Sequence, residues 1–319
     1  VILNSKITIK IEKGMEKINT LKYYGWSFGD RYDGWRIRKA DPIFSVAPFI
    51  LPTRVDSEVF FQVKIPIDII ESFIKKHKVE MPDLSIMHVV IASLVRLISQ
   101  RPYLNRFIVW NKIFTRNHLS FSLVIKRAMT MIAEETVIKP YYLPTDCLKD
   151  IVEKTNKEVL SNQQVGHENS SDFISKMMGY LPDFLLRTVI FLIKQLDRIG
   201  LMPKFLFNAS PFHTSIFLTN IGSIGIDSIY HHLYEFGTCS IFGAMGKKSR
   251  KNVIENDGTI KAVKSIQLKF VLDERICDGF YYASSMRLIE KILNKPEQLL
   301  LPPEKVVVDD GVGKKRIDI

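Results

Sequence analysis

The stretch Asp273-Glu274-Arg275-Ile276-Cys277-Asp278-Gly279 decides the fold, because it joins an apolar run to the last helical pattern of the chain. The apolar run at 266–272 predicts a strand over about 264–272. Gly279 permits a tight turn, and the apolar spacing over about 283–293 predicts a closing helix. A strand, a charged turn and a helix are therefore expected in succession.

Further strands and helices are predicted upstream of this turn from the spacing of apolar residues. Strands are expected at 60–65, 107–114, 119–126, 215–220 and 239–245. Helices are expected at 67–77, 85–100 and 148–161, the second with an N-cap signal at Asp83 and Ser85. The strands 107–114 and 119–126 are expected to pair around a turn at 116–118, and residues 23–58 are expected to form an irregular arm.

Composition indicates a globular protein with a basic surface. The chain has 319 residues, 46% of them hydrophobic, which is enough for one large domain or two small ones. The formal net charge of +11 favours anionic partners, although an unspecialised basic surface would give the same balance. No nucleic-acid-binding module is recognised, so nucleic acid is not an expected partner.

The cysteines and the two ends of the chain bear on its location. Cys147, Cys239 and Cys277 lie far apart without paired spacing, which argues against a disulfide framework or a zinc site and fits a reducing cytoplasm. The first residues lack the features of a secretory signal, and Met15 is a candidate natural start. Residues 1–22 are expected to be disordered or to precede the native start, and residues 303–319 to form a flexible tail.

Residues 172–206 form an apolar segment with interspersed basic residues. Pro182, Asp183, Arg187 and Lys194 interrupt it, so it is too short for the roughly 20 apolar residues that span a bilayer. A helical hairpin is expected instead. It would lie on an anionic membrane surface, cover a lipidic acyl chain, or pack on its own core or on a neighbouring subunit.

Taken in order, several motifs resemble the acyltransferase catalytic domain of the 2-oxo acid dehydrogenases (the dihydrolipoyl acyltransferases) and chloramphenicol acetyltransferase. They are Arg101-Pro-Tyr-Leu-Asn105, Phe217-Leu-Thr-Asn-Ile-Gly222, Cys239-Ser-Ile-Phe-Gly-Ala-Met245 and Cys277-Asp-Gly-Phe280. The resemblance covers roughly residues 55–300. It implies a chloramphenicol acetyltransferase-like α/β fold in two layers, with a mixed, mostly antiparallel sheet covered by helices, over a domain at 23–302. It also implies a homotrimer with active sites between subunits.

Glu274 stands where this family has its catalytic histidine. A free glutamate titrates near about 4.3, some two to three pKa units too low for efficient proton abstraction from a thiol or hydroxyl. Three readings stay open: Glu274 is the base, another residue is the base, or the domain is not catalytic. His213 is the better substitute base, whereas His231 and His232 are expected in a solvated loop.

The resemblance also assigns roles to other residues. Thr219 would donate to the oxyanion, unless its hydroxyl is bonded locally, and Asp278 would hold the turn by pairing with an arginine, namely Arg36, Arg38 or Arg54. Lys247, Lys248 and Arg250 would grip the phosphates of coenzyme A, or else lie in a solvated hairpin.

The expected function is CoA-dependent transfer of an acyl group to an unidentified small or lipidic acceptor. Acyl-CoA would be the co-substrate, with no metal ion. The alternative is a catalytically silent relative that binds acyl-CoA or scaffolds a complex. A cytoplasmic location is expected. Within the cytoplasm, the protein either is free or associates with a membrane surface through residues 172–206.

Overall fold

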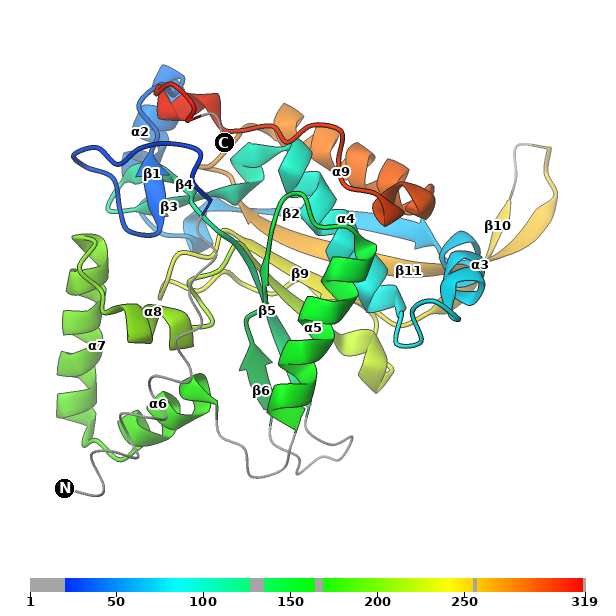
Figure 1. Cartoon of the computed structure of the whole chain (residues 1–319), viewed down its shortest axis with the longest axis horizontal. Coiled ribbons are helices and arrows are strands. Elements are labelled where there is room, and N and C mark those ends of the chain that lie inside the picture. Colours follow the sequence, from blue (N-terminus) through cyan, green and yellow to red (C-terminus); the bar gives the residue numbers. More distant parts are fainter. Residues whose placement is uncertain (1–20, 127–134, 164–168, 255–256, 318–319) are drawn as a thin grey trace.

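The computed structural model describes residues 21–126, 135–163, 169–254 and 257–317, which form a mixed sheet covered by helices (Figure 1). The helices are α2 Pro42–Ile50, α3 Asp68–His77, α4 Ile86–Gln100, α5 Leu148–Gln163, α6 Ser170–Gly179, α7 Asp183–Arg198, α8 Lys204–Ala209 and α9 Gly279–Leu293. The strands are β1 Gly34–Arg36, β2 Glu58–Pro66, β3 Arg106–Val109, β4 Lys112–Arg116, β5 Leu119–Lys126, β6 Glu135–Ile138, β7 Tyr141–Tyr142, β8 Ile216–Asn220, β9 Ile241–Met245, β10 Ser249–Ile254 and β11 Ile260–Asp273. The predicted mixed α/β architecture is confirmed.

Strand β11 organises the large sheet. It pairs antiparallel with β2 and with β9, and its first half pairs antiparallel with β10. Beyond β9 the sheet continues through β8 and β5, and these two contacts are parallel. β5 then pairs antiparallel with β6 and β7. The sheet is therefore mostly antiparallel, and β11 carries the charged turn at its C-terminal end.

Helix α4 forms the centre of the layer that covers the sheet, together with α5 and α9 (Figure 1). Its N-terminus is capped by Ser85, whose hydroxyl accepts from the backbone N–H of His88 while the His88 ring accepts from the Ser85 backbone N–H. Most of its side chains are buried, including Val89, Val90 and Leu94. The predicted helix at 85–100 is thus confirmed, and it anchors the main hydrophobic core.

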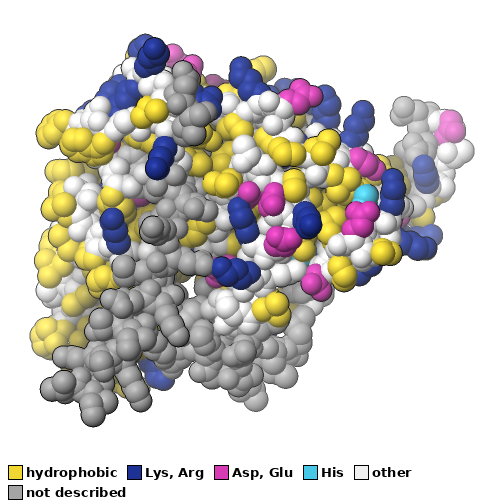
Figure 2. Space-filling view, viewed as in Figure 1, with side chains coloured by type: hydrophobic (Ala, Val, Ile, Leu, Met, Phe, Trp, Pro, Cys, Tyr) yellow, Lys and Arg dark blue, Asp and Glu magenta, His cyan; other side chains and the backbone are white. Residues whose placement is uncertain are grey.

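Helices α6 and α7 lie at one side of the molecule, joined by a short turn (Figure 1). α6 packs mainly against α8 and β6 and not along α7, so the expected hairpin is only partly formed. Asp197 is the buried residue of α7, and hydrophobic side chains gather along this edge of the surface (Figure 2). Exposed apolar residues of α7 and its C-terminal end are Phe184, Leu185, Phe191, Leu192, Leu196 and Ile199. Packing on the chain's own core therefore does not account for them. In the described ranges, no helix has the length and apolarity to cross a bilayer.

The expected single strand over 107–114 is wrong. Trp110 and Asn111 adopt positive φ angles of 47° and 58°, which fold the segment into a tight hairpin of β3 and β4. β4 pairs with β1 and β3 in a separate three-stranded sheet, whereas β5 lies in the large sheet. The predicted pairing of 107–114 with 119–126 is therefore also wrong.

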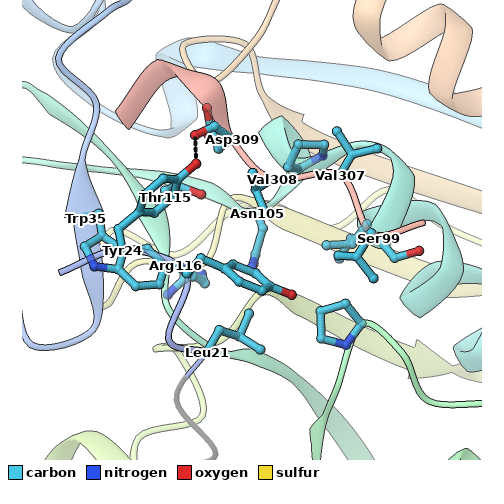
Figure 3. Close-up of a pocket in the computed structure, with 15 residues that line it drawn as sticks. Leu21, Tyr24, Trp35, Ser99, Asn105, Thr115, Arg116, Val307, Val308 and Asp309 are labelled. Atoms are coloured by element: carbon cyan, nitrogen blue, oxygen red, sulfur yellow. Dashed lines mark hydrogen bonds between the residues drawn. The ribbon is translucent and has the colours of Figure 1, made fainter. Parts of the chain in front are cut away.

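Residues 303–317, expected to form a flexible tail, are packed against the domain. Asp309 and Arg106 form a buried ion pair (2.7 Å), and the Tyr24 hydroxyl donates to the Asp309 carbonyl (Figure 3). The Val307 N–H donates to the Ser99 carbonyl at 2.8 Å. Tyr24, Ser99, Val307 and Asp309 line a cavity of only ≈ 30 Å³, which is room for water and not for an acyl chain. The expected disordered segment 1–22 lies almost wholly outside the described residues.

Candidate functional site: the turn after β11

A buried ion pair holds the turn between β11 and α9. Arg275 donates from Nε and from a terminal nitrogen to the two oxygens of Asp273 at 2.8 and 2.7 Å, and it also donates to the Leu51 carbonyl. The exposed fractions of the two side chains are 3% and 0%. The Asp273 carboxylate also accepts from the backbone N–H of Arg275 at 3.1 Å, and the Asp273 carbonyl accepts from the Ile276 N–H at 3.3 Å. The turn is therefore fixed by the residues on either side of Glu274.

Glu274 is the exposed member of this buried triplet. Its backbone N–H donates to the Ser57 carbonyl at 2.9 Å, which ties the turn to the start of β2. Arg275 uses its guanidinium for Asp273, so it does not lock Glu274 in an ion pair. Within the described ranges the Glu274 carboxylate has no hydrogen-bonding or ionic partner, and it is therefore free to meet a substrate.

Asp278 does not pair with an arginine, which corrects the expectation. Its side chain accepts from the backbone N–H of Tyr281 at 2.7 Å and caps the N-terminus of α9. The three arginines proposed as partners bond elsewhere. The Arg38 side chain bonds Asp30, Arg54 bonds backbone carbonyls, and Arg36 shows no bond to Asp278 in the described part of the chain. The cap explains why α9 begins at Gly279, four residues before the predicted start.

Thr219 lies near the end of β8, opposite Ala244 of β9, which in turn lies opposite Lys269 of β11. Glu274 is five residues beyond Lys269, or roughly 16 Å along the strand direction. Thr219 and Glu274 of one chain therefore cannot meet. Among the described residues the Thr219 hydroxyl has no hydrogen-bond partner, so it is not bonded locally and remains available as a donor.

The basic segment Lys247, Lys248 and Arg250 lies at the Thr219 end of the sheet. It follows β9 directly, and Gly246 touches Gly222 just after β8. Lys248 forms a partly exposed ion pair with Glu71 (2.6 Å), while Lys247 and Arg250 are exposed. The structure thus brings Thr219 and the basic segment together, and it separates both from Glu274.

His213 is part of the core, which corrects its expected role as a substitute base. It has no exposed surface, and its ring nitrogens contact the Ser210 hydroxyl (2.7 Å) and the Asp197 carboxylate (3.3 Å). Burial lowers the pKa of its imidazole, and the interaction with Asp197 opposes this. Because both nitrogens are engaged inside the protein, His213 cannot take a proton from a bound acceptor.

The loop before β9 carries His231 and His232. Leu233 donates to the Glu58 carboxylate at 2.5 Å, and Glu58 lies opposite Asp273 in the sheet, so this loop runs close to the turn. His231 is not a solvated histidine as expected, because its ring stacks on Phe242 and its Nε2 is buried without a partner in the described residues. His232 is exposed, as expected.

Sequence reasoning named Arg54 only as a candidate partner of Asp278, and it missed the roles of Asp273 and Arg275. Arg54 is 6% exposed, and its electrostatic partners include Asp273, Arg275 and Glu235. Burial lowers the pKa of its guanidinium. The available signal was an aspartate at the end of a strand, since an aspartate side chain often bonds the backbone N–H two residues further on and so starts a turn.

Comparisons with known proteins bear on the fold of this chain and on one segment of its sequence. The family model "2-oxoacid dehydrogenases acyltransferase (catalytic domain)" matches residues 212–301. The dihydrolipoamide acetyltransferase of Azotobacter vinelandii has a similar structure, with a TM-score of 0.52 at 11% identity over 76% of this chain and 84% of its own. A search of curated protein sequences gives no match.

Two other solved structures give lower scores. A probable dihydrolipoamide acetyltransferase from Listeria monocytogenes has a TM-score of 0.49 at 15% identity, over 79% of this chain and 88% of its own. A chloramphenicol acetyltransferase has a TM-score of 0.49 at 8% identity, over 81% and 97%. The matched segment contains β8, β9, β11, the charged turn and α9. Residues 212–301 thus match the model of the 2-oxoacid dehydrogenase acyltransferase catalytic domain, and the described chain has the fold of a dihydrolipoamide acetyltransferase catalytic domain.

Proposed function

We propose that this protein is a CoA-dependent acyltransferase in which Glu274 takes the place of the family's histidine. The observation that carries the proposal is the state of Glu274. It is the exposed carboxylate of a turn that is otherwise buried from Asp273 to Cys277, and it has no partner in the described part of the chain. A carboxylate kept free at the position of the base is what proton transfer requires.

In the proposed reaction, the Glu274 carboxylate accepts the proton of an acceptor thiol or hydroxyl. The acceptor sulfur or oxygen attacks the thioester carbonyl carbon of acyl-CoA, and the carbonyl oxygen becomes an oxyanion. Thr219 donates a hydrogen bond to that oxyanion. The carbon–sulfur bond of the thioester then breaks, and the CoA thiolate leaves and takes back the proton from Glu274.

The proposal needs a second copy of the chain. Thr219 and Glu274 lie at distant points of one sheet, so a complete site combines Glu274 of one subunit with Thr219 of the next. By resemblance, the copies form a cyclic trimer. Lys247 and Arg250 then accompany Thr219, where their exposed charges suit the phosphates of coenzyme A.

The acceptor is proposed to be small or lipidic. Exposed Phe184, Phe191 and Leu192 on α7, with Arg187 nearby on the same helix, support contact with an anionic membrane surface or with a neighbouring subunit.

Thiol release from short-, medium- and long-chain acyl-CoA, with and without candidate acceptors, tests the proposal. Glu274→Gln should abolish acceptor-dependent release, whereas Glu274→His should retain or raise it because an imidazole titrates closer to neutral pH. Glu290→Gln, an equal charge change at an exposed position of α9, is the control and should have no effect. Wild-type activity in Glu274→Gln would refute the assignment of the base, and intact CoA binding without any release would favour a silent relative.

Mixed assemblies test the shared site. Glu274→Gln and Thr219→Val should each lose activity, the latter by about 10²–10³-fold. After subunits of the two variants are unfolded together and refolded in equal amounts, about one quarter of the sites should combine an intact Glu274 with an intact neighbouring Thr219. Recovery of that fraction supports the intersubunit site, and no recovery after verified mixing contradicts it.

A further inference from the structure

A second pocket lies beside the turn, between the C-terminal end of α7 and the body of the domain. Its volume is ≈ 200 Å³. It is walled by the β3–β4 turn with Trp110, the end of α7 with Lys194 and Arg198, and the loop around Phe236. Arg54 and Arg275 close it from inside, and Glu274 is not among its lining residues. The pocket is therefore separate from the proposed catalytic carboxylate.

The two carboxylates of the pocket are already engaged. Asp197 is bonded by Arg31 at 2.7 Å. Burial alone would raise the pKa of its carboxyl, but the contacts with His213 and Arg31 hold this pKa well below its ordinary value. Glu235 accepts from the backbone N–H groups of Arg54 (2.6 Å) and Val55 (3.3 Å). In the described part of the chain, neither carboxylate forms an ion pair with Arg54, Lys194 or Arg198, the other cations of the pocket.

Arg54 is the unsatisfied cation at the base of this pocket. Its side chain donates to the Ile108 carbonyl at 3.0 Å and makes two long bonds of 3.4 Å to the carbonyls of Tyr234 and Glu235. Its Nε is buried and has no acceptor among the described residues. A buried guanidinium bonded only to neutral carbonyls is costly unless an anion completes its surroundings.

Lys194 and Arg198 add charge from the outer wall. Their positions at the pocket result from the way α7 is attached to the domain. Asp197, which lies between them in the sequence, anchors the helix to Arg31 and His213. In the described ranges neither side chain has a carboxylate partner. Arg275 pairs with Asp273, which also attracts Arg54, and Arg31 is shared between Asp197 and Asp33. Among the residues that line the pocket, four cations (Arg54, Arg275, Lys194 and Arg198) stand against two carboxylates (Asp197 and Glu235), which leaves a surplus of two positive charges.

We propose that this pocket binds the phosphate group of a small molecule. A phosphate monoester carries close to two negative charges and several acceptor oxygens, which match the surplus and the unfilled donors. The volume is below the usual range for a whole drug-sized ligand, so the pocket suits a phosphate or diphosphate group with a small attachment. The site is formed with the α6–α7 segment, and its existence does not require that the protein transfers acyl groups. The ligand is either a free small phosphate or the phosphate end of coenzyme A.

Calorimetric titration with inorganic pyrophosphate at low ionic strength tests the site. The double variant Lys194→Glu/Arg198→Glu should bind roughly tenfold more weakly or worse, since it reverses two charges of the pocket. Arg187→Glu, the same kind of change on α7 away from the pocket, should bind as the wild type does. Circular dichroism of each variant checks that the fold is retained. Trp110 lines the pocket, so its fluorescence should change on binding and the change should disappear in Trp110→Phe.

Equal affinity in the wild type and the double variant would overturn the proposal, and so would an equal loss in Arg187→Glu, because the attraction would then come from overall charge. Malonate is the carboxylate probe, and binding as tight as that of pyrophosphate would overturn the preference for phosphate. Competition between coenzyme A and pyrophosphate would identify the coenzyme as the source of the phosphate, and independent binding of the two would support a free small phosphate.

Discussion

Loss of the Arg275 guanidinium should destabilise the domain by about 3–5 kcal/mol, because it leaves the buried Asp273 carboxylate without its partner. The pair makes two short bonds, and both side chains are almost fully buried. In Arg275→Met, Arg54 remains close enough to attract Asp273, so the cost should lie near the low end of this range. In Asp273→Leu, the two arginines face each other unneutralised, so the cost should lie near the high end.

The double variant Asp273→Leu/Arg275→Met removes both charges together and should cost clearly less than the sum of the single changes. Urea unfolding followed by circular dichroism measures all four proteins, and the difference gives the coupling energy, expected to be about 2 kcal/mol or more. Glu274→Gln is the matched control within the same turn, and its exposed side chain predicts a change within about 0.5 kcal/mol. Additive single costs would refute the view that this pair holds the turn.

Three further outcomes are expected. Lys139, whose pKa burial lowers from 10.5 to about 7, binds a proton more tightly in the unfolded chain, so the free energy of unfolding should rise by up to about 1.4 kcal/mol per pH unit between these values. Lys139→Met should flatten that slope in urea titrations at several pH values, and an unchanged slope would contradict the burial effect. If α7 docks on lipid, vesicles of anionic but not neutral composition should float the protein at low salt, and Leu192→Asp should prevent it. Without flotation of the wild type, contact with a subunit is the better account. Asp278→Ala should cost about 1 kcal/mol through loss of the α9 cap, while a cost several times larger would indicate a buried ion pair instead.

Local patterns predicted much of this fold. The helix at α4 was predictable because a capping residue, an apolar stripe and a terminating proline all lie within one short segment. The strands β8, β9 and β11 were predictable because each contains a short apolar run, and together with the charged turn they indicated the family. The β3–β4 hairpin was missed because tryptophan is an unusual residue for a positive φ angle, and Asn111 alone was too weak a signal.

Long-range pairs were beyond the reach of the sequence. Arg106 and Asp309 are separated by 203 residues, so nothing local distinguishes the packed C-terminal segment from a loose one. The burial of His213 depends on Asp197, which belongs to the α6–α7 segment, and on the exact docking of that helix. Glu274 was identified by its place in a motif, but its exposure depends on where its neighbours' side chains point.

The arrangement at the end of β11 makes position 274 unusually open to substitution. The residues before and after it carry the cost of holding the turn, and the side chain between them points to solvent. A change of acid–base chemistry at this position therefore requires no rebuilding of the scaffold. For the same reason, a library of all side chains at position 274 should consist almost entirely of folded proteins, and differences in turnover among them would report chemistry alone.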